Sequence, residues 1–146
     1  MDFAKILKEA EDIENINKSI AYSESKFPQL KFIFCSLVCP EKAPPNLAAW
    51  WMLNRGIHST DPSWTGLLLI DPKSRQVSFQ TGYDLEVFID QAKVEQALTE
   101  SSEWFKIEEW AQGVIEFYKE LHKALKQSHR KALKTQKQAL KSIPKS

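Results

Sequence analysis

A short apolar run near the middle of the chain constrains the fold most strongly. The run "TGLLLID" (65–71) is almost continuously apolar, as expected of a strand covered on both faces. The turn-forming stretch "PKSR" follows it, and "QVSFQTG" (76–82) then alternates apolar and polar side chains. These features predict a β-hairpin formed by residues 66–71 and 75–82, with its first strand in the interior of a sheet.

Helical and strand patterns precede the hairpin. Residues 3–25 place apolar side chains three and four positions apart, which predicts an amphipathic helix. The segment "LKFIFCSLVC" (30–39) predicts a buried strand that holds both cysteines in the core rather than in a disulfide or a metal site. A second helix should end near Gly56. Four of its apolar side chains are predicted to face the core: Leu47, Trp50, Trp51 and Leu53.

Two more helical patterns follow the hairpin, over 91–102 and 106–125. The order helix, strand, helix, hairpin, helix, helix predicts an α/β fold of the α+β-like kind: a mixed sheet of about four strands with helices on both faces. With 146 residues, 42% of them hydrophobic, the chain is long enough for one domain with a real core. We expect that domain at 1–125, followed by a basic amphipathic helical tail at 126–146.

Charge is distributed unevenly along the chain. All 19 acidic residues lie at or before Glu120, whereas eight of the 20 basic residues lie from Lys123 onward. The preceding residues therefore carry a net charge of −7 and the C-terminal segment a net charge of +8. This asymmetry is typical of a segment that contacts an anionic partner.

Several functions fit the basic tail. It could be a solvated helix whose lysines pair with the acidic domain, a surface for an anionic membrane or a protein partner, or a short coiled-coil seam along Leu125, Leu133 and Leu140. Nucleic acid is disfavoured, because no aromatic residue interleaves the lysines to stack on bases. The candidate partner-binding residues are Lys126, Arg130, Lys131, Lys134, Lys137 and Lys141.

The other chemical candidates are carboxylates. Asp61 precedes the central strand, and Asp84, Glu86 and Asp90 follow the hairpin, so the two segments could meet at the strand ends. Oxygen ligands of this kind suit Ca²⁺ or Mg²⁺. Each acid alone could equally be a solvated turn residue or a helix-start charge, and Asp90 is well placed to cap a helix beginning at Gln91. The sequence contains no nucleophile elbow and no glycine-rich phosphate loop.

Neither end of the chain reads as an export signal, and no window approaches the roughly 18 consecutive apolar residues of a membrane span. These features predict a cytoplasmic protein without a transmembrane segment.

Four motifs between about 50 and 90 resemble the TPM domain family. They are Arg55-Gly56-Ile57, the run Gly66 to Ile70, the turn Pro72 to Arg75, and Gly82-Tyr83-Asp84-Leu85-Glu86. This family includes the thylakoid-lumen acid phosphatase-like proteins of photosystem II repair and many bacterial membrane-associated proteins. In element order the resemblance covers residues 3–125. It implies the TPM fold and, by the activities of family members, either calcium binding or hydrolysis of phosphate esters.

Two departures from the family pattern bear on activity. Trp64-Thr65 stands where the family has Asp-Asn, and Asp84 replaces the middle glycine of its Gly-Tyr-Gly-Leu-Glu motif. Of the implied site acids, Glu86 and Asp90 match the family. The leading hypothesis is an interaction or accessory module with a degenerate acidic cleft; the alternative is a Ca²⁺- or Mg²⁺-dependent, acid phosphatase-like hydrolase. The sequence leaves open whether the protein is an enzyme.

Overall fold

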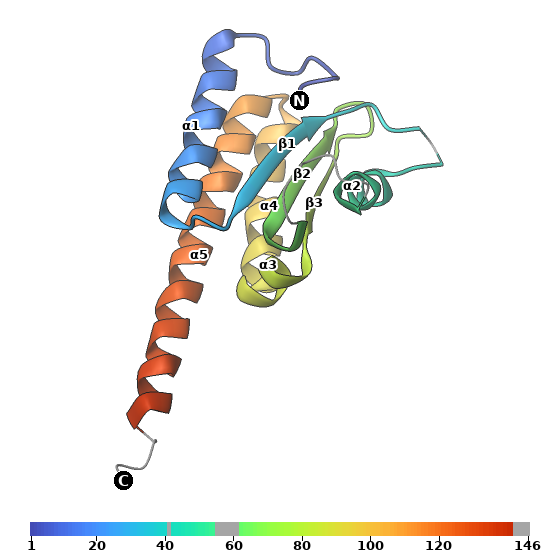
Figure 1. The fold of residues 1–146 in the computed structure, drawn as a ribbon. Coiled ribbons are helices and arrows are strands. Elements are labelled where there is room, and N and C mark those ends of the chain that lie inside the picture. Colours follow the sequence, from blue (N-terminus) through green and yellow to red (C-terminus); the bar gives the residue numbers. More distant parts are fainter. Residues whose placement is uncertain (41, 55–61, 142–146) are drawn as a thin grey trace.

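The computed structural model describes residues 1–40, 42–54 and 62–141. In this part of the chain the sheet has three strands, in the order β1 (Lys31–Ser36), β2 (Thr65–Asp71) and β3 (Gln76–Thr81). β1 runs parallel to β2, and β2 pairs antiparallel with β3 (Figure 1). The predicted hairpin and the mixed sheet are confirmed, and the described residues form three strands where about four were predicted.

The N-terminal residues pack against the end of β1 before the first helix begins. Asp2 forms a single isolated bridge to Ser36, and its carboxylate accepts hydrogen bonds from the backbone N–H groups of Ile6 and Leu7. Lys5 adopts a left-handed backbone conformation with φ 54°. The helix predicted from residue 3 therefore begins later, as α1 (Ala10–Lys26).

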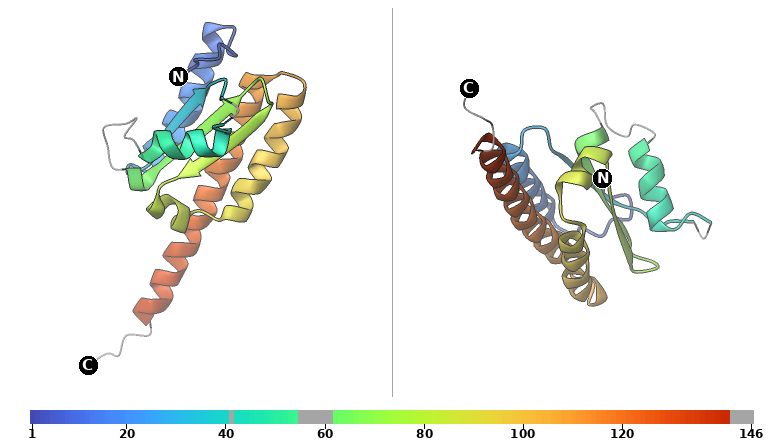
Figure 2. Two further views of the ribbon diagram at one scale, coloured as in Figure 1. Left: turned by 90° about the vertical axis from the view of Figure 1, so that its right-hand side faces the viewer. Right: turned by 90° about the horizontal axis from the view of Figure 1, so that it is seen from below.

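Helices cover both faces of the sheet, as predicted. α1, α4 (Gln91–Lys106) and α5 (Trp110–Lys141) pack on one face, and α2 (Pro45–Asn54) lies on the other (Figures 1 and 2). Two short elements, η1 (Pro62–Trp64) and α3 (Tyr83–Phe88), lie at one end of the sheet.

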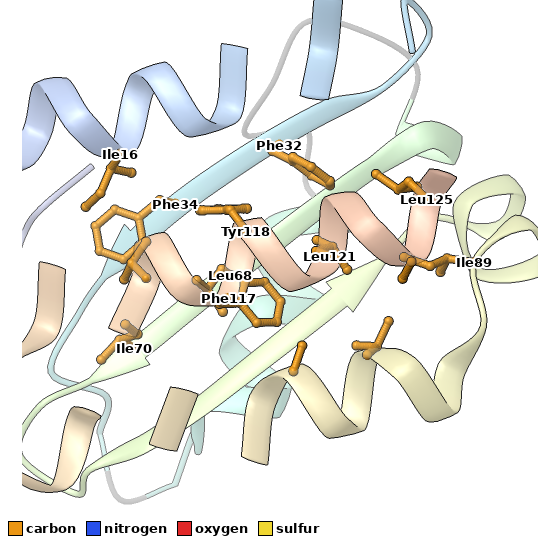
Figure 3. Packing of buried hydrophobic residues seen from close by; sticks show 14 of the residues in the cluster. Ile16, Phe32, Phe34, Leu68, Ile70, Ile89, Phe117, Tyr118, Leu121 and Leu125 are labelled. Carbon is orange, nitrogen blue, oxygen red and sulfur yellow. The ribbon is translucent and has the colours of Figure 1, made fainter. Parts of the chain in front are cut away.

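The larger core lies between the sheet and the three-helix layer. Side chains of alternate strand residues, such as Phe32, Phe34, Leu68 and Ile70, meet the buried face of α5 (Figure 3). The intervening residues of β1 and β2, including Cys35, Leu67 and Leu69, form a smaller core with α2. All seven residues of β2 are buried, because this strand has a sheet neighbour on each side and a helical layer on each face. Its continuous apolar run is thereby explained.

α2 does not pack as predicted. Leu53 is buried, together with Ala49, but Leu47, Trp50 and Trp51 are 43%, 53% and 51% exposed. Among the described residues α2 is the one helix on its face of the sheet, so only one stripe of its surface packs on β2 and β3. The prediction that all four apolar side chains face the core was wrong for three of them.

Cys35 lies in the core, as predicted, whereas Cys39 lies beyond the end of β1 and packs only partly buried against the smaller core. Cys35 is fully buried and Cys39 half-buried, and both are free. Burial raises the pKa of the Cys35 thiol to about 11, which keeps it protonated at neutral pH.

α5 extends far past the sheet. Its first half supplies buried side chains as far as Leu125, whereas the residues from Lys126 to Lys141 are exposed except for the half-buried Ser128. This projecting segment (residues 126–141) is about 24 Å long at 1.5 Å per residue. It is the continuation of a core helix, as Figure 1 shows. Although α5 is long, no helix in the described residues has the apolar stretch needed to cross a membrane.

Candidate functional site

α3 is the element on which the predicted acids lie, and the sequence did not predict it as a helix. Its six residues begin directly after Gly82, and the backbone N–H of Glu86 donates to the Gly82 carbonyl. Leu85 is fully buried and anchors the helix to the core. Tyr83 and Val87, on the opposite side, are 75% and 70% exposed. α3 therefore presents two apolar side chains to solvent.

The carboxylate of Asp84 connects α3 to η1. The Ser63 hydroxyl lies 2.6 Å from Asp84 Oδ2 and donates to it, and the backbone N–H of Asp84 lies 3.1 Å from the same Ser63 oxygen. The Trp64 and Phe88 rings pack edge to face beside this pair, with centroids 5.6 Å apart. Ser63 was not recognised from the sequence, because its partner lies 21 positions away.

Asp90 caps α4, as predicted. Its Oδ1 accepts a hydrogen bond of 3.0 Å from the backbone N–H of Ala92, which satisfies one of the free donors at the helix start. Glu86 is exposed, and within the described residues its carboxylate has no hydrogen-bond partner. The three acids of this segment thus have different local roles.

These acids do not by themselves form a metal centre. Within residues 1–40, 42–54 and 62–141 there is no group of three or more His, Cys, Asp or Glu side chains that could hold an ion. The fourth predicted ligand, Asp61, lies outside the described residues. The set Asp61, Asp84, Glu86 and Asp90 therefore stays a prediction.

A groove of about 1050 Å³ lies between α3 and the projecting segment of α5. One wall carries Asp84 and Asp90 together with the exposed side chains of Tyr83 and Val87. The other wall is α5, along which the groove extends for about four turns. Its lining residues there are Ala124, Gln127, Ser128, Lys131, Ala132, Thr135, Gln136 and Ala139. The acidic segment and the basic helix, which the sequence presented as separate candidates, meet in this groove.

The charges of the projecting segment lie on one side of the helix. Successive residues of a helix are about 100° apart, so the six predicted partner-binding cations fall within an arc of about 140°. Of these six, Lys131 lines the groove. No ion pair forms between any of the six and another described residue, whereas Lys123, one turn earlier, pairs with Glu120. The structure thus gives no support to pairing of the tail with the acidic domain.

A buried histidine joins α5 to α1 just before the projecting segment. The Nδ1 atom of His122 lies 2.8 Å from the Ser23 hydroxyl, and its ring packs against Tyr22 with centroids 4.6 Å apart. Burial lowers the pKa of His122, and the nearby cations Lys126 and Lys26 lower it further. The neutral imidazole therefore holds α1 against the point from which α5 projects.

Comparison with known families decides the classification. The model of the TPM domain matches residues 1–124. The chain belongs to the TPM domain family. The matched region ends within α5, close to the last buried side chain, so the projecting segment lies wholly beyond it.

Solved structures agree with this fold. The N-terminal domain of the cg2496 protein from Corynebacterium glutamicum is 16% identical, with a TM-score of 0.67 over 84% of this chain and 76% of its own. An N-terminal domain of a P. gingivalis protein is 22% identical, with a TM-score of 0.69 over 87% of this chain and 81% of its own. The BA42 protein of Bizionia argentinensis is 13% identical, with a TM-score of 0.68 over 82% of each chain. At these identities the likeness establishes the TPM fold. A search of curated protein sequences gives no match.

Proposed function

We propose that this TPM domain is an interaction module that binds an anionic partner through the projecting segment of α5. The observation that carries the proposal is the row of six cations on one side of that segment, which no described acid neutralises. Binding costs little reorganisation, because the cations are held on a preformed helix that continues from the core.

Electrostatics set the expected strength. A lysine near an anionic surface contributes about 1 kcal/mol, so three lysines together account for roughly a 100-fold change in affinity. At about 1 M salt the Debye length falls to about 3 Å, and most of this contribution disappears. Salt-sensitive binding is therefore the signature of the proposed role.

The test uses two anionic probes, fluorescent poly-glutamate and vesicles containing phosphatidylserine. Replacing Lys134, Lys137 and Lys141 by Gln should weaken binding of at least one probe by about 100-fold. The matched variant with Arg at the same three positions should bind like the unmodified protein, because it keeps the charge. Equal binding by the Gln and Arg variants would show that the projecting segment is not the interaction surface.

The hydrolase alternative has less support from the described residues. Both groove carboxylates already have structural partners, Ser63 for Asp84 and the start of α4 for Asp90. A phosphatase assay with Ca²⁺, Mg²⁺ or Mn²⁺ separates the two functions. Turnover that is lost in both Glu86→Ala and Asp90→Ala would favour the hydrolase and contradict a purely non-catalytic module.

A further inference from the structure

We infer that the partner of the groove is a second copy of this chain. In this arrangement the projecting segment of each copy lies antiparallel in the groove between α3 and α5 of the other, around a two-fold axis. The inference rests on the proposed role of α5 as an interaction surface, and it names the occupant.

The groove has the size of half a helix. A helix about 24 Å long and about 10 Å wide occupies roughly 1900 Å³, so a helix inserted to half its depth fills about 950 Å³. The groove volume is about 1050 Å³, and it extends along α5 from Ala124 to Ala139. The projecting segment has this length and leaves the body of its own chain as an exposed helix.

The side chains on the groove face of α5 allow two such helices to approach closely. Ser128, Ala132, Thr135 and Ala139 are small and uncharged, and they recur along the groove-lining face of the helix. Small residues permit short interaxial distances between packed helices. Of the six cations, Lys131 lies on this face and the other five lie outside it, so the small uncharged side chains of two copies can meet.

The same contact would cover the exposed apolar side chains around the groove. Tyr83 and Val87 of α3 line the groove and are 75% and 70% exposed. Moving apolar side chains of this size from water into a protein interface is favourable. Because the dimer is two-fold, these side chains would be covered in both copies.

Charge complementarity selects the antiparallel direction. α3 carries Asp84 and Glu86 and no basic residue, and Asp90 follows it. Asp84 and Asp90 line the end of the groove nearest the folded core of the domain. The tip of α5 carries Lys134, Lys137 and Lys141 and no acid. Within one chain the continuous helix holds this tip away from α3 (Figures 1 and 2). An antiparallel second copy brings its basic tip to the acidic end of the groove, whereas a parallel copy would place the two basic tips together.

An anionic bilayer fits the shape of this surface less well. The groove is concave, whereas a helix that lies in a membrane interface inserts a broad apolar face. On the uncharged side of the projecting segment, Leu133 and Leu140 are the only large apolar residues among small and amide side chains. A bilayer is therefore tested as the competing partner.

The experiment measures self-association of the full chain by sedimentation velocity over a range of concentrations at low and high salt. The tip variant carries Lys134→Glu, Lys137→Glu and Lys141→Glu. The groove variant carries Glu86→Lys and Val87→Lys, at two exposed positions of α3. A control carries the same charge change as the tip variant at three exposed lysines elsewhere, as Lys8→Glu, Lys42→Glu and Lys73→Glu.

The unmodified protein and the control should dimerise, with weaker association at high salt. Each of the two variants alone should self-associate at least about tenfold more weakly, because it places like charges in contact. An equimolar mixture of the two variants should dimerise again, because each basic tip then meets an acidic groove and each acidic tip a basic groove.

Three results would overturn the inference: a monomer at every concentration, a dimer that both variants leave unchanged, or a mixture that stays monomeric. If the monomer still binds phosphatidylserine vesicles or poly-glutamate through its lysines, the second copy is wrong and the interaction module stands. If the monomer binds neither probe, both proposals are wrong.

Discussion

Replacing Gly82 by alanine should destabilise the protein more than its small size suggests. Gly82 directly precedes α3 and has an ordinary extended backbone, with φ −69° and ψ 168°, so conformational freedom does not explain the glycine. Space does. A Cβ at this position would lie 2.6 Å from the carbonyl carbon and oxygen of Ser63 and closer still to the carbonyl oxygen of Pro62. These are backbone atoms, which cannot rotate away.

The size of the effect follows from what has to move. The backbone of η1 must shift by well over 1 Å to restore ordinary contact distances, and overpacking of this kind costs about 1–3 kcal/mol. The shift also strains the hydrogen bonds between Ser63 and Asp84, each of which contributes about 1 kcal/mol. We expect Gly82→Ala to lower the free energy of unfolding by about 2–4 kcal/mol, or the melting temperature by roughly 10 °C for a chain of this size.

Urea denaturation and thermal melting, both followed by circular dichroism, measure this loss. Gly113→Ala is a comparison at another closely packed glycine: its Cβ would meet the buried Phe105 ring, which stacks on Trp110, rather than backbone atoms. Alanine also gains up to about 1 kcal/mol of helix propensity in α5, which offsets the contact. If Gly82→Ala were as stable as the unmodified protein, the close approach of η1 to residue 82 would be refuted.

Three further predictions concern single side chains. The pKa of His122 is lowered in the folded state, so the unfolded state takes up the proton first as the pH falls. The free energy of unfolding should therefore decrease as the pH drops from about 7.5 through the ordinary histidine pKa near 6.5. Urea midpoints should show this loss in the His129→Gln control and much less of it in His122→Gln. Asp90→Ala should lower the free energy of unfolding by about 1 kcal/mol, because it removes the cap of α4, whereas Asp90→Ser should keep most of the capping contribution. Equal melting temperatures for the two variants would contradict the capping role. Leu121→Ala should lower the free energy of unfolding by about 2–5 kcal/mol, because Leu121 is fully buried. Leu133→Ala in the projecting segment should leave the free energy of unfolding of the monomer nearly unchanged. A similar loss from both variants would place Leu133 in the core.

The parts of the fold that the sequence predicted well are those governed by local patterns. A continuous apolar run bounded by turn residues is enough to identify β2, and alternation is enough to identify β3. α3 escaped prediction because Tyr83, Leu85 and Val87 alternate with acids, a pattern typical of a strand. The helix forms there because Ser63 and the close approach at Gly82 hold the backbone of residue 84, and both contacts are tertiary.

Helix faces were harder to predict than helices. α2 contains the apolar spacing of a buried helix, but how much of its surface is covered depends on how many elements share its side of the sheet. The candidate site shows the same limit. The acids and the lysines were both identified from composition and spacing, whereas the groove that brings Asp84 and Lys131 together depends on the direction in which α5 leaves the body.

The continuity of α5 carries most of its C-terminal cations away from the sheet. Between Gly113 and Pro144 the sequence has neither glycine nor proline, and residues 123–141 consist mostly of Lys, Ala, Leu, Gln and Arg, which are strong helix formers. A flexible basic tail of the same composition could fold back onto the acidic body and neutralise it. On the continuous helix none of these cations forms an ion pair with a described acid, so they stay available to an anionic partner. The same chain carries the complementary groove, which is why a second copy is the simplest partner that satisfies both its acidic and its basic surface.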